Sequence, residues 1–388
     1  MNIKKIITFT FLFFVIALIV GLSSCDRVSQ IIQPTTSQMT ETSEEIAIGV
    51  VLPLTGRLKD AFGTPTSQAF ELALSEINAA QPHGVKLKFI IKDDQSTVEG
   101  AIEAFNKLIQ QEGVSVILGP VTSSQTKEVF PIAQENQVVA ISATSSARGL
   151  SAIGDFVFRV ALTTDVLIPT GIEVTQAKLG YQTAATLYDE TDLFSTDGDE
   201  AVREVLKARG IEVLTTETFQ GGDTDFLGQL TRIQTLNPDV IFVSSLSPEK
   251  PGILTQGHEL GISAPFIMRT LTAEDVQAAG AAAESAITFV GWGTPINTPR
   301  NQAFIQNYSE IYGTAPNNYA ARSYAALHIL AAAIANAQAT DAISIRDALA
   351  NIRDFDTIFG KFSFDANGDA VYDAKVLIVK DGKLILFE

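Results

Sequence analysis

The amino-acid sequence predicts an α/β protein, in which short apolar strands alternate with helices around mostly parallel sheets. One observation is the order of elements at residues 114–141. An apolar run at residues 114–118 is followed by a helical segment, and a second apolar run covers residues 138–141. Two such runs with a helix between them form a parallel βαβ unit. The other observation is length, since residues 46–388 suffice for two α/β lobes.

The same alternation extends through the chain. Residues 46–52 form an apolar run, and residues 66–79 then place Phe70, Leu74 and Ile77 on one helical face. The other predicted strands, each a short apolar run, are residues 87–92, 183–188, 211–216, 239–244, 266–268 and 287–292. The other predicted helices, each with helical periodicity, are residues 102–109, 199–209, 226–236, 301–312 and 317–337. Two alternating runs around Asp381-Gly382 predict a closing hairpin at residues 375–387.

Both apolar runs of the βαβ unit end in loops rich in hydroxyl groups. The first loop covers residues 121–124 and the second covers residues 142–146. Parallel strands place both loops at one edge of the sheet, where open α/β sheets bind ligands. Hydroxyls beside the free amides of a helix start favour an anion, and a small carboxylate suits these loops better than a polyphosphate. The alternative is that Ser123 and Ser124 only cap a helix.

The first residues have the pattern of an export signal. Basic residues at 4–5 precede an apolar run at residues 6–22. Leu22-Ser23-Ser24-Cys25 resembles a lipobox, which implies cleavage before Cys25 and lipidation of its thiol. We therefore predict a lipoprotein signal peptide at residues 1–24. An uncleaved membrane anchor is the alternative, because the apolar run is just long enough to span a bilayer.

Composition narrows the classes of protein further. Cys25 is the only cysteine, so the exported part forms no internal disulfide. The polar stretch at residues 25–45 is expected to be a lipidated, flexible tether. A net charge of −17 and a pI near 4.6 argue against binding to nucleic acid or to anionic lipid surfaces.

An ordered set of motifs resembles one family. The motifs are PLTG at residues 53–56, Phe62-Gly63, IKDDQS at 91–96, ILGPVTSS at 117–124 and ISATSS at 141–146. Their order and spacing resemble type I periplasmic solute-binding proteins, especially the leucine/isoleucine/valine-binding family that serves ABC importers. The resemblance covers nearly all of the exported part. It implies two Rossmann-like lobes joined by a multi-strand hinge.

The resemblance also implies lobe boundaries and ligand contacts. Lobe 1 would hold residues 46–163 and 293–365, and lobe 2 residues 164–292 and 366–388. Ser123, Ser142 and Thr144 match positions that hold a ligand carboxylate, through hydroxyls and nearby amides. The remaining expected contacts, which line or close the cleft, are Phe62, Phe194, Leu246, Thr270 and Tyr319.

One departure from the family concerns the ligand's ammonium group. Family members that bind amino acids place an acid after the strand that here ends at Met268. This chain has Arg269-Thr270-Leu271 there, with Glu274 and Asp275 further on. A buried, unpaired ammonium group would cost several kcal/mol. We therefore expect an apolar or amide-like carboxylate, unless Glu274 or another acid takes over the missing role.

The sequence does not favour an enzyme or a metalloprotein. Nucleophile-elbow, zincin, P-loop and dinucleotide-binding motifs are missing. Residues 365–369 resemble the start of a calcium loop, but its sixth and twelfth positions do not fit, so we expect a turn. His328, within the helix at residues 317–337, is expected to be a packed histidine. No cofactor and no metal are expected.

These features predict a monomeric solute-binding lipoprotein of an ABC importer, on the outer face of the cytoplasmic membrane or in the periplasm of a diderm. It would capture a branched-chain amino acid or a related carboxylate between its lobes and present it to permease subunits. Alternatives are a receptor for amides, urea or short carboxylates, an envelope lipoprotein that binds a protein, and an exported hydrolase. The hydrolase alternative is weak because no histidine lies near the hydroxyl loops.

Overall fold

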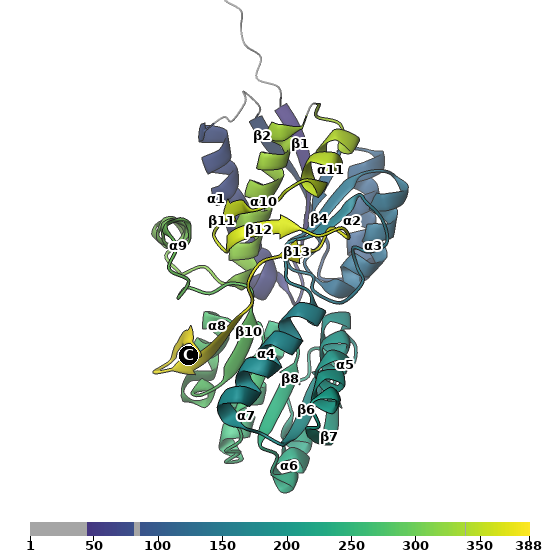
Figure 1. Cartoon of the computed structure of the whole chain (residues 1–388). Helices are drawn as coiled ribbons and strands as arrows, with labels where there is room; N and C mark the ends of the chain where they lie inside the picture. Colours follow the sequence, from purple (N-terminus) through teal and green to yellow (C-terminus); the bar gives the residue numbers. More distant parts are fainter. Residues whose placement is uncertain (1–44, 81–85, 338) are drawn as a thin grey trace, which may run out of the picture. The chain divides into compact units, whose positions relative to one another are not determined.

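The computed structural model describes residues 45–80, 86–337 and 339–388 of the chain. The predicted signal peptide, the lipidation site at Cys25 and nearly all of the tether lie outside these residues. Within them, two mostly parallel sheets alternate with helices, which confirms the predicted α/β class (Figure 1). The sheets belong to two lobes of one compact unit.

The sheet of the first lobe has the strand order β2-β1-β3-β4-β5, with every neighbouring pair parallel. Its strands are β1 (Glu45–Leu52), β2 (Lys86–Asp93), β3 (Val116–Leu118), β4 (Val139–Ser142) and β5 (Val157–Arg159). Side chains alternate between its two faces. Ile48 and Val50 join the core that contains α1 and α10, whereas Val51 packs with residues of α2 and α3. Burial on both faces explains the nearly continuous apolar runs.

Helices of the first lobe come from both ends of the chain (Figure 1). They are α1 (Thr64–Ala80), α2 (Val98–Gln110), α3 (Ser123–Glu135), α9 (Pro299–Tyr312), α10 (Asn318–Asn336) and α11 (Ala342–Ala350). A π-helical turn, Lys59–Gly63, leads into α1. A small antiparallel sheet with β11 (Phe355–Thr357), β12 (Gly360–Phe364) and β13 (Ala370–Val371) adds phenylalanines to the same core.

The sheet of the second lobe has the order β15-β14-β10-β9-β8-β6-β7. Its strands are β6 (Thr183–Asp189), β7 (Glu212–Phe219), β8 (Val240–Ser244), β9 (Phe266–Arg269), β10 (Ile287–Val290), β14 (Lys375–Lys380) and β15 (Lys383–Leu386). In it, β10 pairs with β14 and β14 pairs with β15 antiparallel, and the other neighbouring pairs are parallel. Its helices are α4 (Thr164–Leu179), α5 (Leu193–Ala208), α6 (Leu227–Leu236), α7 (Lys250–Glu259) and α8 (Ala273–Ala279). The hairpin expected around Asp381 is confirmed.

The described chain passes between the two sheets after β5, after β10 and after β13. The last passage comes later than residue 365, the boundary that the family resemblance implies. The Arg159 amide donates to the Gly368 carbonyl at 2.9 Å, and Ala370 pairs with Phe364. We therefore propose that lobe 1 extends to Val371 and that lobe 2 resumes at β14. The other predicted boundaries stay proposals.

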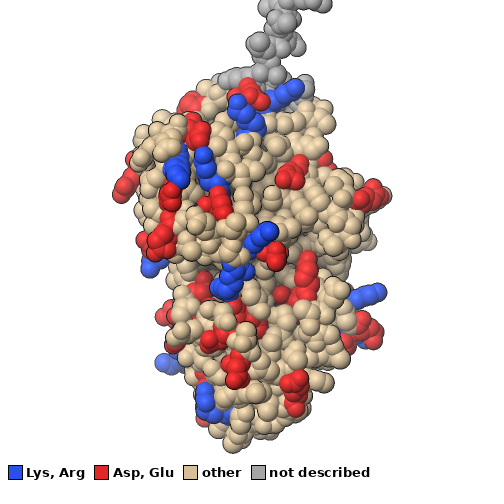
Figure 2. Space-filling view, turned by 180° about the vertical axis from the view of Figure 1, so that it is seen from behind, with Lys and Arg blue, Asp and Glu red and all other residues tan. Residues whose placement is uncertain are grey.

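Charged side chains are mixed on the face that Figure 2 shows. Acidic side chains are spread over it, and basic side chains lie between them rather than forming a large area of one sign. This agrees with the net charge of −17. Among the described residues, no helix combines the length and the apolar character that crossing a membrane requires.

Candidate functional site

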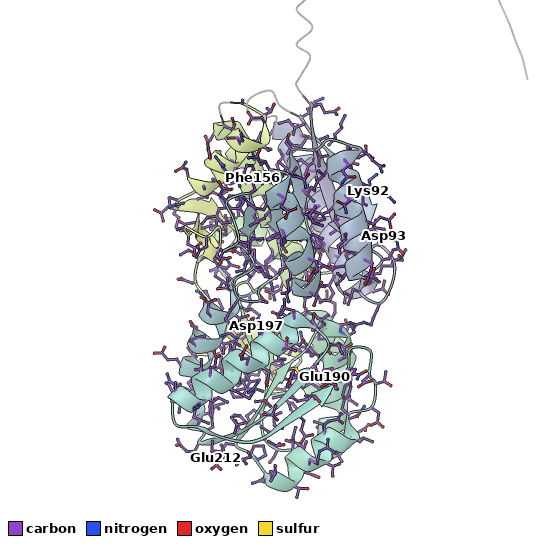
Figure 3. All side chains as sticks on the ribbon, turned by 90° about the vertical axis from the view of Figure 1, so that its right-hand side faces the viewer. Lys92, Asp93, Phe156, Glu190, Asp197 and Glu212 are labelled. Carbon is purple, nitrogen blue, oxygen red and sulfur yellow. The ribbon has the colours of Figure 1, made fainter. Side chains whose placement is uncertain are left out.

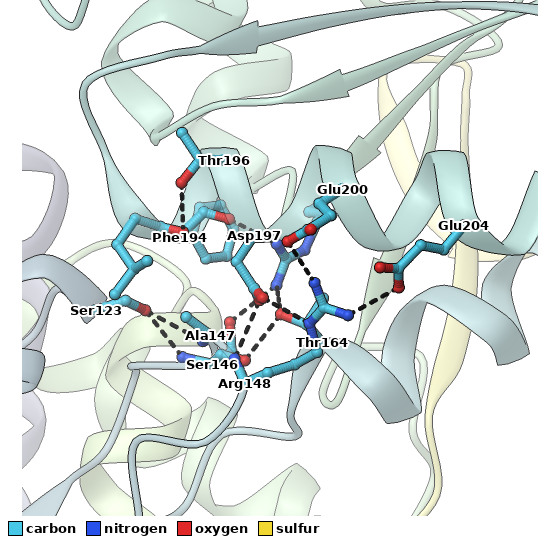
Figure 4. A network of polar contacts seen from close by, with 12 residues as sticks. Ser123, Ser146, Ala147, Arg148, Thr164, Phe194, Thr196, Asp197, Glu200 and Glu204 are labelled. Atoms are coloured by element: carbon cyan, nitrogen blue, oxygen red, sulfur yellow. Dashed lines mark hydrogen bonds and ion pairs between the residues drawn. The ribbon is translucent and has the colours of Figure 1, made fainter. Parts of the chain in front are cut away.

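The two hydroxyl loops meet through the side chain of Ser123. Thr122, and not Ser123, caps α3, because its hydroxyl accepts the Gln125 amide at 3.3 Å. Ser123 Oγ instead accepts the amides of Ser146 at 3.3 Å and Ala147 at 3.2 Å (Figure 4). A hydroxyl that accepts two bonds still has a proton to donate. Ser123 therefore joins the loops and retains a donor for a ligand.

The hydroxyls of Ser142 and Thr144 are used inside the loops. Ser142 Oγ donates to the Pro120 carbonyl at 2.7 Å, and Thr144 Oγ1 donates to the Val121 carbonyl. Both residues are buried. These bonds hold the loop after β4 against the loop after β3. We therefore expect a carboxylate to contact backbone amides here, rather than the hydroxyls of Ser142 and Thr144.

Two of the predicted aromatics, Phe62 and Tyr319, lie in contact. Phe62 comes from the π-helical turn before α1, and Tyr319 from the first turn of α10, with ring centroids 4.3 Å apart. Both are buried. The Tyr319 hydroxyl lies 3.1 Å from the Ser247 hydroxyl, which follows β8 in the second lobe. This pair therefore reaches the boundary between the lobes.

The three predicted site residues of the second lobe differ from one another in what they contact. Phe194, in the first turn of α5, lies under the guanidinium group of Arg269, 4.0 Å from its ring centroid. Leu246 is buried in the core cluster of the first lobe. Thr270 is buried with a φ of 55°, and its carbonyl accepts the Lys250 ammonium group at 2.9 Å. Only Phe194 packs directly against the polar network of Figure 4.

Arg269 is a site residue whose role the sequence did not predict. It ends β9, is 3% exposed and lies between the two lobes. Its Nη1 donates to the Phe194 carbonyl at 2.8 Å, and its Nη2 lies 3.0 Å from the hydroxyls of Ser146 and Thr164. The sequence marked this position only as a departure from an expected acid. In the structure, the arginine contacts the loop that is expected to hold the ligand carboxylate.

Both acids that follow Arg269 accept hydrogen bonds from neutral groups of the protein. Glu274 is exposed and accepts a hydrogen bond from Asn317 at 3.3 Å. Asp275 is buried, and one of its oxygens accepts both the Thr272 amide and the Ser247 hydroxyl. The structure therefore gives no support to Glu274 or Asp275 as a substitute ammonium partner.

Ion pairs and hydrogen bonds connect the lobes around this site. Asp197 lies where the two lobes meet (Figure 3). Arg148, in the loop after β4, pairs with it at 2.6 Å (Figure 4). It also pairs with the exposed Glu200 and Glu204, and exposed pairs contribute about 0–1 kcal/mol each. Ser124 Oγ donates to Asp192 at 3.0 Å. Residues of α5 thus close over both hydroxyl loops in this structure.

The periplasmic binding protein family matches residues 45–383 of the chain. This range includes every residue of the site described above and both sheets up to the start of β15. The chain belongs to the periplasmic binding protein family. As a member, it is an exported solute-binding protein of ABC transporters and not an enzyme, which confirms the family prediction.

Individual relatives support the same assignment. The leucine-binding protein LivK of Thermotoga maritima is 26% identical, with a TM-score of 0.83 over 88% of this chain and 98% of that one. LivJ of Streptococcus pneumoniae, solved with isoleucine, is 28% identical, with a TM-score of 0.81 over 88% of this chain and 98% of that one. The Leu/Ile/Val-binding protein BraC3 of Rhizobium johnstonii is 25% identical and aligns with 84% of this chain and 89% of its own length.

The loop at residues 365–369 of this binding protein is a turn between β12 and β13. Asp365 Oδ1 accepts the amides of Asn367 at 2.9 Å and Asp369 at 2.8 Å. The Asp369 carboxylate pairs with Arg159. Among the described residues, no cluster of three or more histidine, cysteine or acidic side chains suits a metal ion. The expected turn is confirmed.

Burial lowers the pKa of the two basic groups beside Thr270. It lowers the pKa of the Lys250 ammonium group to about 8 and that of the Arg269 guanidinium group to about 10. Lys250 is fully buried, and its charge is favoured by Asp275 and Glu249. At pH 7 both groups are therefore cations in an enclosed environment.

The stability of the protein is expected to depend on pH through Asp94, in the loop after β2. It is fully buried, and burial raises its pKa from 3.8 to about 6. In the unfolded chain this carboxyl group loses its proton at a lower pH than in the folded protein. Stability therefore falls as the pH rises from about 4 to about 6. Asp94→Asn is expected to raise the free energy of unfolding at pH 7 by on the order of 1–2 kcal/mol, with little effect at pH 4. Urea denaturation at several pH values measures this difference.

Asp93 provides the matched control for that measurement. Burial alone would raise the pKa of its carboxyl group, but hydrogen bonds from Thr55, Gln95 and Leu54 outweigh burial and lower that pKa. Its charged form therefore stabilises the protein above its unfolded pKa, and this contribution is lost as pH falls. Asp93→Asn is expected to lower stability at pH 7. Equal pH profiles for the two variants would contradict the assignment.

Proposed function

We propose that this binding protein captures a small carboxylate-bearing solute between its lobes and presents it to the permease of an ABC importer. The observation that carries the proposal is the junction of the two hydroxyl loops at Ser123. The first amides of a helix have no acceptor within the helix, and they favour an anion. Together with the Ser123 hydroxyl, the amides at the start of α3 provide donors for one carboxylate.

The aromatics at the lobe boundary support the rest of the proposal. Phe62 and Tyr319 would contact the apolar part of the solute from the first lobe, and Phe194 would close over it from the second. A solute that contacts both lobes stabilises the closed form, and so shifts an open–closed equilibrium. The isoleucine in LivJ and the names of the Leu/Ile/Val-binding relatives favour a branched aliphatic skeleton.

The proposal includes a lipid anchor at Cys25, which would hold a monomer on the outer face of the cytoplasmic membrane or in the periplasm of a diderm. It rests on the lipobox-like residues 22–25. The mass of the mature N-terminal peptide tests this part, and an unmodified Cys25 would contradict it.

Thermal unfolding of the purified protein tests solute binding. The panel contains branched-chain amino acids, their amides, urea and short carboxylates, each added after denaturation and refolding to remove co-purified solute. A ligand at a thousand times its Kd adds about 4 kcal/mol of stability. We expect a large shift with at least one carboxylate, and little with urea or amides. A panel without any shift would favour an envelope protein that binds another protein.

The double variant Ser123→Ala with Thr144→Ala tests the location of the carboxylate. Loss of the Ser123 donor and loosening of the loop that Thr144 holds are expected to weaken carboxylate binding by at least tenfold. Isothermal titration with the carboxylate that gives the largest thermal shift measures the change. An unchanged affinity would place the carboxylate elsewhere. Ser67→Ala, on the exposed side of α1, is the control.

A further inference from the structure

Two arginines at the junction of the lobes are buried without an ion-pair partner among the described residues. Arg269 is 3% exposed and Arg322 is 4% exposed. Burial of a charged group without a partner is strongly unfavourable, so buried arginines in proteins are normally paired. Arg159 is an example in this chain, because it is fully buried and lies 2.7 Å from the Asp369 carboxylate.

Arg322 has the fewest partners of the three. It lies one turn after Tyr319 in α10, with its guanidinium carbon 5.7 Å from the centre of that ring. Its Nη1 donates to the Thr144 carbonyl over a long distance of 3.4 Å. Its Nε is buried, and no acceptor among the described residues reaches it. A guanidinium group that only stabilised the fold would be expected to have more acceptors.

Arg269 approaches the same loop from the second lobe. Its Nη2 donates to the Ser146 hydroxyl, and its Nε is also buried without an acceptor in the described part of the chain. The charges of Asp192 and Asp197 favour its cationic form. Their carboxylates are bonded elsewhere, to the Ser124 hydroxyl and to Arg148. Neither approaches Arg269 closely enough to form an ion pair.

The two guanidinium groups therefore contact one short loop from opposite lobes. Arg322 binds it at Thr144 and Arg269 binds it at Ser146, next to the amides that Ser123 accepts. Asp192 and Asp197 are bonded elsewhere, Glu274 is exposed, and Asp275 accepts hydrogen bonds from Ser247 and Thr272. An anion beside this loop would supply the negative charge that both arginines lack. An ammonium group would be repelled by both.

We propose that Arg322 and Arg269 make the solute of this binding protein a small organic acid that has no ammonium group. This inference rests on the proposed function and names its substrate class. Arg322 is the specificity-determining residue of the first lobe, and Arg269 is its counterpart in the second. Closure brings Arg269 of the second lobe to the loop that Arg322 contacts within the first lobe, so an anion between the lobes favours the closed form over the open one.

Matched pairs of ligands test the substrate class. The probes are leucine with 4-methylpentanoate, phenylalanine with 3-phenylpropanoate, and glutamate with pentanedioate, which share a skeleton and differ in the ammonium group. Isothermal titration is expected to show at least tenfold tighter binding of the acid in every pair that binds. Equal or tighter binding of an amino acid would overturn the inference and leave the proposed function intact. A panel in which no carboxylate binds would count against the proposed function instead.

The variant Arg322→Met tests the inference in two ways, by the stability of the ligand-free protein and by the binding of an acid. Because it replaces an unpaired buried cation by an apolar side chain of similar length, it is expected to raise the Tm of the ligand-free protein by about 2 °C or more. It is also expected to weaken binding of the best acid by roughly 10- to 100-fold. Arg159→Met is the matched control, and its Tm should fall. A Tm of Arg322→Met that is unchanged or lower would show that Arg322 serves the fold, and would overturn the inference.

Discussion

Replacement of Arg159 by methionine is expected to lower the free energy of unfolding by about 3–5 kcal/mol. Arg159 ends β5, and its guanidinium group lies 2.7 Å from the Asp369 carboxylate while it donates to the Ala147 carbonyl. The variant leaves a largely buried carboxylate without its cation and a buried carbonyl without its donor. It also releases the loop that ends at Ala147, which Ser123 holds. Urea denaturation at pH 7 measures the loss.

The exposed pair of Arg300 and Asp356 provides the comparison. Its atoms are 2.8 Å apart, but both side chains are more than half exposed. Arg300→Met is therefore expected to change stability by less than about 1 kcal/mol. Replacement of both Arg159 and Asp369 by apolar residues should recover part of the loss. A loss below 1 kcal/mol for Arg159→Met would show that the buried pair contributes little.

The second large effect is expected from Gly198→Ala in α5. Alanine normally stabilises a helix interior relative to glycine by about 0.5–1 kcal/mol. Here an added Cβ would lie 2.1 Å from Arg269 Nη1 and 2.3 Å from Ser244 Oγ. The guanidinium group would have to leave its acceptors at Phe194 and Ser146. We expect a net loss of about 2–4 kcal/mol, from overpacking and from broken bonds to a buried charge.

Gly228→Ala is the control for that substitution. Gly228 also lies in a helix, α6, but an added Cβ would meet only the Arg232 side chain at 3.6 Å, an ordinary contact. Its stability should stay the same or rise by up to about 1 kcal/mol. The difference in midpoint between the two variants in urea isolates the contact with Arg269. Similar midpoints would mean that Arg269 moves without cost.

Local sequence patterns predicted the parts of the site that local structure decides. Apolar runs that end in glycine, proline or hydroxyl residues gave the βαβ unit, because buried parallel strands need such runs and their loops meet at one edge. The position of Ser123 between the loops follows from this geometry. That Phe62 and Tyr319 line the same side of the cleft is an expectation from the family resemblance alone, because no pattern connects residues so far apart.

Long-range contacts explain what the sequence could not predict. Arg322 and Thr144 are 178 positions apart, and Arg269 and Ser146 are 123 apart. Neither spacing has a periodic signature. The hydroxyls of Ser142 and Thr144 are the opposite case, since their type suggested ligand contacts but each bonds a carbonyl of the neighbouring loop. One signal was available in the sequence, an arginine at 269 where the family resemblance implies an acid.

A crystal structure with the carboxylate that gives the largest thermal shift tests the central claim most directly. The account predicts that the solute lies between the lobes, with one carboxylate oxygen on the Ser123 hydroxyl and the first amides of α3. Its negative charge would face Arg322 from the first lobe and Arg269 from the second. A solute bound outside this junction, or one whose carboxylate contacts neither Ser123 nor the start of α3, would contradict the account.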